Sequence, residues 1–353
     1  MPHTSVLIVD DSALIRRMLT EMLNSDPAIS VVGAAPDPIV AREMIKALNP
    51  DVVTLDIEMP RMDGLAFLEK IMTLRPMPVV MISSLTQKGA DVALRALEIG
   101  AVDYVAKPTI GLSDGFALLR DEIVSKVKTA AKARIRPLGR DRPTVATLPT
   151  GTGYSSSDKL IAVGASTGGV EALHRLISAF PADSPAILVT QHMPALFTAG
   201  FASRLNQRCS VTVLHATDGE RVLPGHVYIA PGGQHLELAR SGANYICRLN
   251  ETAPVSGHRP SVDVLFRSVA RAAGANSIGI ILTGMGRDGA AGLLEMRQAG
   301  ASTIGQDESS CVVYGMPKAA HEIGATEIEL PIEKIAAHTL NDCRVTAKRA
   351  VRV

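Results

Sequence analysis

Short apolar runs rich in valine and isoleucine alternate with segments of helical period over the first 124 residues. The runs cover residues 6–10, 29–35, 52–56, 78–84 and 101–108, and helix candidates such as 13–23, 38–48 and 90–98 lie between them. Strands that alternate with helices indicate a parallel sheet with helices on both faces. We therefore predict a doubly wound, five-stranded α/β domain over residues 1–124, with a final helix that begins near residue 113.

The pattern and the composition both change after this region. Residues 126–142 contain seven basic residues and one acid, Asp141, and a Pro/Thr/Gly/Ser tract without apolar period follows. We predict a linker over residues 125–157, helical in its first part. The basic run has no interleaved aromatic residues and no recognition-helix pattern, which favours a solvated helix end or a docking surface over a nucleic-acid site.

The alternation resumes at residue 159. Apolar runs cover residues 160–166, 186–192 and 277–286, and helix candidates cover 169–180, 196–206 and 262–273, with a further helix from about 289. Extended segments at 211–216, 226–230 and 245–249 interrupt this order. We predict a second α/β domain over residues 158–353, with a mostly parallel sheet and some antiparallel or irregular insertion.

The composition limits the partners and the compartment. The 353-residue chain is 46% hydrophobic and has a formal net charge of +1, which argues against a general attraction to nucleic acid or to anionic membranes. Asp10 and Asp11 interrupt the first apolar run, so no signal peptide is expected, and no run approaches the ~18 apolar residues of a membrane span. The four cysteines lack C-x-x-C spacing. We expect a cytoplasmic protein with reduced thiols and no membrane insertion.

Chemically active side chains follow four strands of the first half. Asp10 and Asp11 end one run, Asp56 ends another, and the remaining two end in Ser83-Ser84 and in Lys107. The carboxyl ends of parallel strands meet at one edge of the sheet, where such folds bind ligands. Clustered carboxylates supply oxygen ligands, which suit Mg²⁺. Aspartate is also a competent nucleophile for phosphoryl transfer. At a single position, a side chain that merely caps the following helix would be the simpler explanation. Helix capping does not explain why all four strand ends carry the residue types that this chemistry needs.

The motifs "VDDSALIRR", "LDIEMPRMDGL", "SSLT" and "YVAKP" resemble those of two-component receiver domains. The resemblance implies that Asp56 accepts the phosphoryl group. It further implies a Mg²⁺ ion held by Asp11, Asp56 and the backbone carbonyl of Glu58. The supporting and switch residues would be Asp10, Ser83, Tyr104 and Lys107.

The stretch "VGASTGG", residues 163–169, allows two interpretations. A dinucleotide site requires G-x-G-x-x-G, but Ser166 occupies the second glycine position, and a phosphate-binding loop would need a lysine after the glycines. The alternative is a nucleophile, since residues 164–168 fit G-x-S-x-G at a strand-to-helix turn. By itself this short motif often occurs by chance.

Two further strand ends support the nucleophile. His192 ends the next strand, and Asp288 follows the strand at 277–286 in a glycine-rich loop. Ser166, His192 and Asp288 then form a candidate triad, with the amides near Met285 and Gly286 as a candidate oxyanion hole. The chain order Ser, His, Asp differs from the Ser, acid, His order of α/β-hydrolases. Competing histidines in the same half are His215, His226, His235 and His258.

The motifs "GASTGG", "TQHMP", "YIAPGG", "HRPSVDVLF", "LTGMGRDGAAG" and "SSCVVYGMPKAA" resemble the catalytic domain of chemotaxis protein-glutamate methylesterases. This resemblance implies hydrolysis of glutamate methyl esters on methyl-accepting chemoreceptors, and deamidation of receptor glutamines. A chemotaxis histidine kinase would phosphorylate the receiver, which would regulate hydrolysis. We expect no metal in the hydrolysis itself, and Thr167, His258 and Arg259 as substrate contacts.

Two other classes of function remain to be weighed. A DNA-binding response regulator would need a helix-turn-helix output module, which the α/β pattern of the second half does not resemble. A non-catalytic scaffold that binds receptors is compatible with the fold, although every residue type that hydrolysis needs is present. Loss of activity on replacing Ser166 separates this scaffold from an enzyme.

Overall fold

The computed structural model describes residues 3–59, 63–83, 86–107, 113–135 and 159–350. The chain divides into two compact units, Met1–Arg142 and Pro143–Val353, and each is described by itself. The division falls within the predicted linker, of which residues 136–157 lie outside the described residues. In the described part of the chain, no helix is both long and apolar enough to cross a bilayer.

The first unit contains the predicted five-stranded parallel sheet, with the strand order β2-β1-β3-β4-β5. In chain order its elements are β1 (Thr4–Val9), α1 (Ala13–Asn24), β2 (Ile29–Ala35), α2 (Pro38–Leu48), β3 (Val52–Asp56), α3 (Gly64–Leu74), β4 (Val79–Ser83), α4 (Gln87–Ile99), β5 (Asp103–Ala106) and α5 (Ser113–Ala130). The prediction of this fold is confirmed. The strand expected over residues 101–108 is shorter, and α5 ends before the basic run does.

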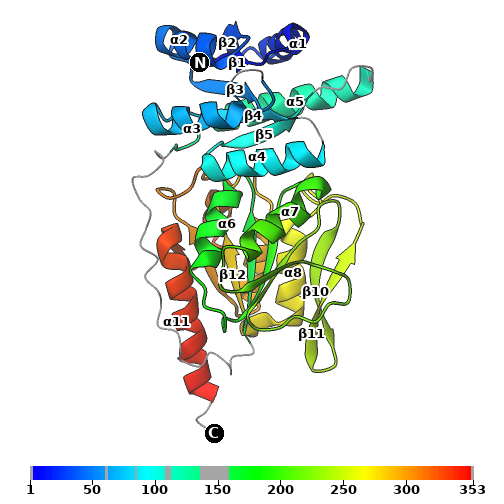
Figure 1. The fold of residues 1–353 in the computed structure, drawn as a ribbon. Helices are drawn as coiled ribbons and strands as arrows, with labels where there is room; N and C mark the ends of the chain where they lie inside the picture. Colours follow the sequence, from blue (N-terminus) through cyan, green and yellow to red (C-terminus); the bar gives the residue numbers. More distant parts are fainter. Residues whose placement is uncertain (1–2, 60–62, 84–85, 108–112, 136–158, 351–353) are drawn as a thin grey trace. The chain divides into compact units, whose positions relative to one another are not determined.

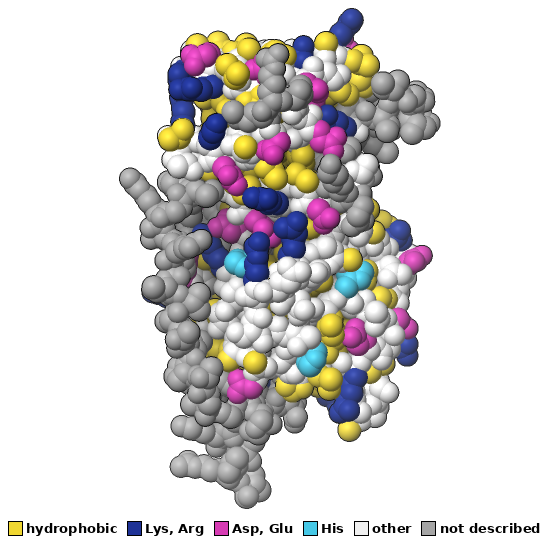
Figure 2. All heavy atoms as spheres, in the orientation of Figure 1, with side chains coloured by type: hydrophobic (Ala, Val, Ile, Leu, Met, Phe, Trp, Pro, Cys, Tyr) yellow, Lys and Arg dark blue, Asp and Glu magenta, His cyan; other side chains and the backbone are white. Residues whose placement is uncertain are grey.

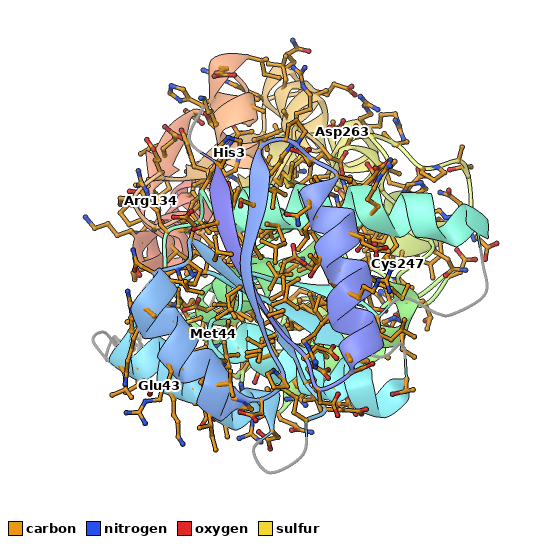
Figure 3. All side chains as sticks on the ribbon, turned by 90° about the horizontal axis from the view of Figure 1, so that it is seen from above. His3, Glu43, Met44, Arg134, Cys247 and Asp263 are labelled. Atoms are coloured by element: carbon orange, nitrogen blue, oxygen red, sulfur yellow. The ribbon has the colours of Figure 1, made fainter. Side chains whose placement is uncertain are left out.

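Local signals explain where the helices of this unit begin. Ser12, Asp37, Asp63 and Thr86 occupy the N-cap positions of α1 to α4, and each side chain accepts a hydrogen bond from a first-turn amide. The amphipathic character of α2 is visible in Figure 3, where Glu43 points away from the sheet and Met44 points toward it. The central strands are buried under the helices, and the removal of their apolar side chains from water stabilises the packing of the helices on the sheet.

The second unit has a seven-stranded sheet whose paired strands all run parallel, in the order β14-β13-β12-β6-β7-β9-β8 (Figure 1). Its elements up to the insertion are β6 (Leu160–Ala165), α6 (Gly169–Ser178), β7 (Ala186–Gln191), α7 (Ala195–Asn206), β8 (Thr212–His215) and β9 (His226–Ile229). After it come α8 (Val262–Ala272), η1 (Gly274–Asn276), β12 (Ser277–Ile281), α9 (Ala290–Gln298), β13 (Ser302–Gln306), α10 (Met316–Glu322), β14 (Ile328–Leu330) and α11 (Ile332–Ala350).

Of the three extended segments expected to interrupt the order, 211–216 and 226–230 contain β8 and β9 of the parallel sheet. Only the segment 245–249 lies in an insertion, which is an antiparallel pair of β10 (His235–Ser241) with β11 (Asn244–Asn250). The sequence pattern predicted β11 but not β10. β6 lies between β12 and β7 in the sheet, so the carboxyl ends of these three strands are neighbours. Basic and acidic side chains are interspersed on the visible surface of both units, in keeping with a net charge near zero (Figure 2).

Candidate functional site

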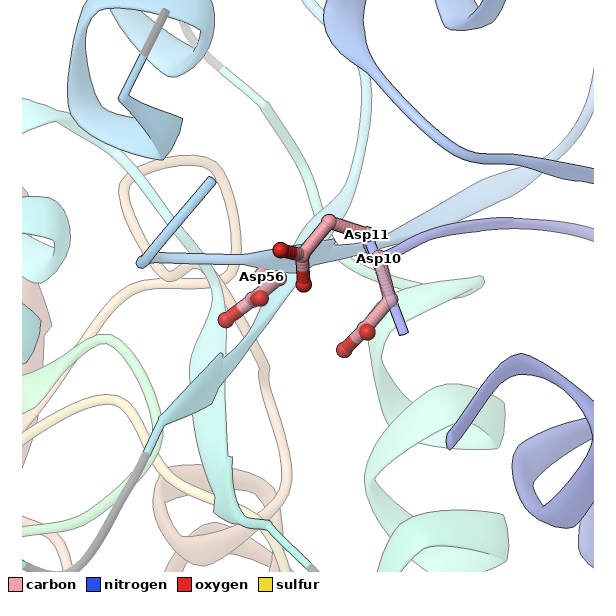
Figure 4. Close-up of side chains that lie close together, drawn as sticks. All are labelled: Asp10, Asp11 and Asp56. Atoms are coloured by element: carbon pink, nitrogen blue, oxygen red, sulfur yellow. The ribbon is translucent and has the colours of Figure 1, made fainter. Parts of the chain in front are cut away.

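Three aspartates of the first unit gather at the carboxyl ends of β1 and β3 (Figure 4). One carboxylate oxygen each from Asp10, Asp11 and Asp56 lies within 4.8 Å of the others. Lys107 follows β5 and places Nζ 2.7 Å from Asp56 Oδ2 and 3.6 Å from Asp10 Oδ2. The tertiary structure thus brings together the three aspartates and the lysine that the strand ends suggested.

The electrostatics of this cluster favour an added cation. Burial raises the pKa of Asp56 to about 6, although the hydrogen bond from Lys107 opposes the shift. Burial also raises the pKa of Asp10, and its buried Oδ2 accepts no hydrogen bond from any described residue. Pairing with Asp56 raises the pKa of Lys107 against the opposing effect of burial. The all-oxygen donor set and the unsatisfied carboxylate oxygen fit Mg²⁺.

Of the other residues expected in the receiver, Glu58 contacts Asp56, Tyr104 lies in β5 and Ser83 lies in β4. The backbone N–H of Glu58 donates to Asp56 Oδ1 at 3.2 Å. The Tyr104 ring is buried, and Lys126 Nζ lies 4.7 Å from its centroid. Ser83 is the last residue of β4, while its side chain and Ser84 lie outside the described residues.

In the second unit, Ser166 lies in the tight turn between β6 and α6. Gly168 precedes α6 with a φ of 78°, a left-handed conformation that glycine adopts readily. A Cβ at Gly164 would lie 2.1 Å from Val262 Cγ1, so glycine there allows α8 to pack against β6. Ser166 and Thr167 immediately precede the positive end of α6, where developing negative charge is stabilised.

Ser166, His192 and Asp288 form one hydrogen-bonded chain. Ser166 Oγ lies 3.1 Å from His192 Nδ1, and His192 Nε2 lies 2.8 Å from Asp288 Oδ2. An ionised carboxylate only accepts, so Nε2 carries the proton and Nδ1 is free to accept one from the serine. The two ring nitrogens are used in the opposite sense from the serine proteases, where Nε2 faces the serine.

The Asp288 carboxylate is held by four hydrogen bonds. Besides His192, Ser261 Oγ donates to Oδ1 at 2.8 Å, Val262 N to Oδ2 at 2.7 Å and Asp263 N to Oδ1 at 3.3 Å. Burial alone would raise the pKa of Asp288, but the bonds from His192, Ser261 and Val262 lower it below its ordinary value. Asp288 is therefore ionised at neutral pH and orients the His192 ring.

The loop between β12 and α9 passes beside Ser166. The Ser166 amide donates to Thr283 O at 3.0 Å, and a Cβ at Gly284 would lie 2.7 Å from the Ser166 Cβ. Met285 is 44% exposed, and Gly286 has a φ of 86°. Gly284 is thus next to the nucleophile, and the two residues expected to supply the oxyanion hole follow it directly in this loop.

The predicted substrate contacts differ in their surroundings. The His258 ring lies over the His192 ring, with centroids 3.6 Å apart. Arg259 Nη1 donates to the carbonyls of Glu251 and Thr252, at 2.8 and 3.2 Å. His258 is therefore at the candidate site, whereas the Arg259 guanidinium holds the loop that precedes α8.

The remaining histidines that competed for the role of base have other partners. His215 Nε2 lies 3.0 Å from Thr198 Oγ1, and His226 Nδ1 lies 2.9 Å from Pro224 O. His235 is buried and accepts from the amide of Ser261 through Nδ1. These contacts leave His192 as the histidine beside Ser166.

Sequence reasoning missed two residues of the site. Ser261 stands at the N-cap position of α8, but its side chain makes no capping bond and donates to Asp288 instead. Gln191, the last residue of β7, donates through Nε2 to the carbonyls of Ser166 and His192. A serine before a helix and a glutamine in a strand both have ordinary structural explanations, so neither carried a signal.

Known protein families match both parts of the chain. Residues 161–339 match the CheB methylesterase family, and residues 6–114 match the response regulator receiver domain. Proteins named protein-glutamate methylesterase/protein-glutamine glutaminase are 58% identical in Bordetella parapertussis, over 96% of this chain and 97% of the relative, and 55% identical in Nitrosomonas europaea, over all of both chains.

Among solved structures, the Thermotoga maritima CheB methylesterase catalytic domain is 39% identical, with a TM-score of 0.50, over 51% of this chain and 96% of that one. The chain belongs to the CheB methylesterase family and carries a response regulator receiver domain ahead of its methylesterase domain.

Proposed function

We propose that this protein hydrolyses the methyl esters of glutamate side chains on methyl-accepting chemoreceptors and deamidates receptor glutamines, under control of phosphorylation. The hydrogen-bonded chain from Ser166 through His192 to Asp288 carries the proposal, because it supplies a nucleophile, a base and an orienting carboxylate. The names of the relatives point to methylated glutamates and to glutamines of proteins, and the resemblance of the motifs points to chemoreceptors as those proteins.

In the proposed reaction, Ser166 Oγ attacks the side-chain carbonyl carbon while His192 Nδ1 takes the hydroxyl proton. Backbone amides at Met285 and Gly286 and the N-terminus of α6 stabilise the negative oxygen. The same Nδ1 then protonates the leaving methoxide, which departs as methanol, or the leaving amine, which departs as ammonia. His192 next deprotonates a water that attacks the acyl-serine, and the proton returns to Ser166. Thr167 contacts the bound substrate in this proposal.

In the receiver, Asp56 accepts the phosphoryl group from a chemotaxis histidine kinase. Asp11, Asp56 and the Glu58 carbonyl would hold Mg²⁺, with Asp10 in support, and the ion would neutralise charge around the incoming phosphoryl group. Lys107 pairs with the added charge through Nζ, Ser83 contacts the phosphoryl group, and Tyr104 responds as the switch position. We assign the receiver to residues 1–124, the linker to 125–157 and the catalytic domain to 158–353.

The proposed setting is the cytoplasm, without nucleic-acid binding and without membrane insertion. The four cysteines are free thiols, which suits a reducing compartment. Hydrolysis is proposed to need no metal because the serine, imidazole and carboxylate account for each proton.

Methanol release from methylated receptor, with and without a small-molecule phosphodonor, tests the proposal. The wild-type protein should release methanol, and Ser166→Ala should lower the rate on the order of 10⁶-fold, as loss of the nucleophile does in a serine hydrolase. Asp56→Asn should remove the response to phosphodonor and leave the basal rate. Receptor binding without methanol release would instead identify a non-catalytic scaffold.

A further inference from the structure

A second histidine lies against the base of the proposed reaction. The rings of His192 and His258 are 3.6 Å apart between centroids, with only 11° between their planes. The two ring nitrogens of His192 bond to Ser166 and Asp288. The N–H and the lone pair of an imidazole are directed in the plane of the ring, so these bonds resist tilting of the ring out of that plane least, and the stacked His258 ring opposes this tilt.

The loop that carries His258 is fastened at several points. Val255 and His258 exchange backbone hydrogen bonds of 3.1 and 2.9 Å, around Ser256 and Gly257 with positive φ values of 54° and 81°. This is the conformation of a tight hairpin turn. Arg259 Nη1 further ties the loop to the carbonyls of residues 251 and 252.

His235 fastens the same loop from β10. Its Nδ1 accepts from the amide of Ser261, and its Nε2 bonds to Ala253 O at 3.2 Å. The loop continues directly into Ser261 and Val262, which hold the Asp288 carboxylate. One rigid segment thus positions both the acid and the ring that covers the base.

The surroundings of His258 keep its ring neutral. Burial lowers the pKa of His258 to about 4, the neighbouring His192 lowers it further, and Asp288 only partly opposes the shift. The charged and titratable groups that act on this ring are therefore His192 and Asp288, from β7 and from the β12–α9 loop. A neutral ring does not repel the imidazolium that forms on His192, and its π face attracts a cation.

Resting on the proposed hydrolysis, we propose that His258 is a positioning residue whose flat ring holds the His192 imidazole in the plane that joins Ser166 to Asp288. What His258 contributes is the ring face and not a ring nitrogen. It does not exchange protons with the substrate or bind it directly.

Two variants of His258 distinguish a role of the ring face from a role of a ring nitrogen. His258→Phe keeps a flat neutral ring, whereas His258→Ala removes it. In the full-length protein acting on methylated receptor, His258→Ala should lower kcat on the order of 10²-fold with little change in KM, the cost of a reacting group displaced by about an ångström. His258→Phe should remain within a few-fold of the wild type. His226→Ala, which removes an imidazole at the start of β9, is the matched control and should not change kcat.

A measurement that does not depend on catalysis tests the role of His258 independently of the proposed function. In full-length protein labelled with ¹⁵N-histidine, His192→Gln identifies the His192 ring signals. These signals should be sharp in the wild type and in His258→Phe, and broadened in His258→Ala because the ring samples more than one plane. Thermal unfolding checks that the variants are folded.

The outcomes are distinct. If His258→Phe loses as much kcat as His258→Ala, a ring nitrogen is required and the proposal is wrong. If His258→Ala raises KM alone, His258 contacts substrate and does not position the base. If His258→Ala leaves the His192 signals sharp, His258 does not restrain the His192 ring and the proposal is wrong. If the wild type releases no methanol, the proposed function fails, while the ring signals still test the stacking.

Discussion

Replacing Asp288 with asparagine changes one atom at the centre of four hydrogen bonds. The amide has one oxygen to accept bonds, whereas the carboxylate accepts two at each oxygen, from His192 and Val262 on one side and from Ser261 and Asp263 on the other. The Ser261 hydroxyl can rotate to accept from the new NH₂ group, but the Val262 amide cannot. We expect the oxygen of the new side-chain amide to face His192 and Val262, so the His192 tautomer survives and what His192 loses is a negatively charged partner.

The magnitude follows from that charge. When His192 becomes an imidazolium, an ion pair at about 4 Å between charge centres is worth about 4 kcal/mol at an effective dielectric constant near 20. Removing it should lower the rate of methanol release by about 10³-fold, since each 1.36 kcal/mol is tenfold. This is a smaller loss than expected for Ser166→Ala. Leaving the Asp263 amide unsatisfied and weakening the charge-assisted bonds should cost about 1–3 kcal/mol of unfolding free energy.

The pH dependence has a definite sign. Because the folded protein lowers the pKa of Asp288 below 3.8, the ionised group stabilises the fold above that pH, and the contribution is lost as the pH falls through the folded value. The stability difference between wild type and Asp288→Asn, measured by urea unfolding, should be full at pH 7 and shrink below about pH 4. A rate loss under tenfold, or a stability difference that grows on acidification, would refute the reasoning.

Two further predictions concern the receiver unit. Gly64→Ala would place a Cβ 2.1 Å from the backbone oxygen of Asp56, so it should cost about 1–3 kcal/mol in urea unfolding; Gly33→Ala meets the flexible side chains of Met44 and Leu48 and is the milder comparison, and equal losses would contradict this account. Mg²⁺ should stabilise the unit by about 1.4 kcal/mol at ten times its dissociation constant, and EDTA should reverse the gain. Asp11→Ala should abolish the effect, and an unchanged response in that variant would exclude the acidic cluster as the site.

The sequence pattern was sufficient to predict the α/β class of both units, because strands that are buried on both faces of a parallel sheet have continuous apolar sequences. Residues 29–35 and 52–56 are strands with the predicted bounds, and residues 38–48 form the predicted helix. The pattern was weaker where tertiary contacts decide the element. β10 alternates imperfectly and is stabilised by pairing with β11 and packing against α8, so its local sequence carried little signal.

For the site, the sequence by itself determined which residue types end the strands, and the pairing of β6 with β7 makes Ser166 and His192 neighbours. Only the tertiary structure decided how they are used: which ring nitrogen faces the serine, which donors hold Asp288, and that His258 covers His192. The alternation of strands and helices follows from apolar periodicity, which is a local property of the chain. Hydrogen-bond direction and ring stacking depend on side-chain rotamers and on loops far apart in sequence, and those are decided only when the packed core brings the loops together.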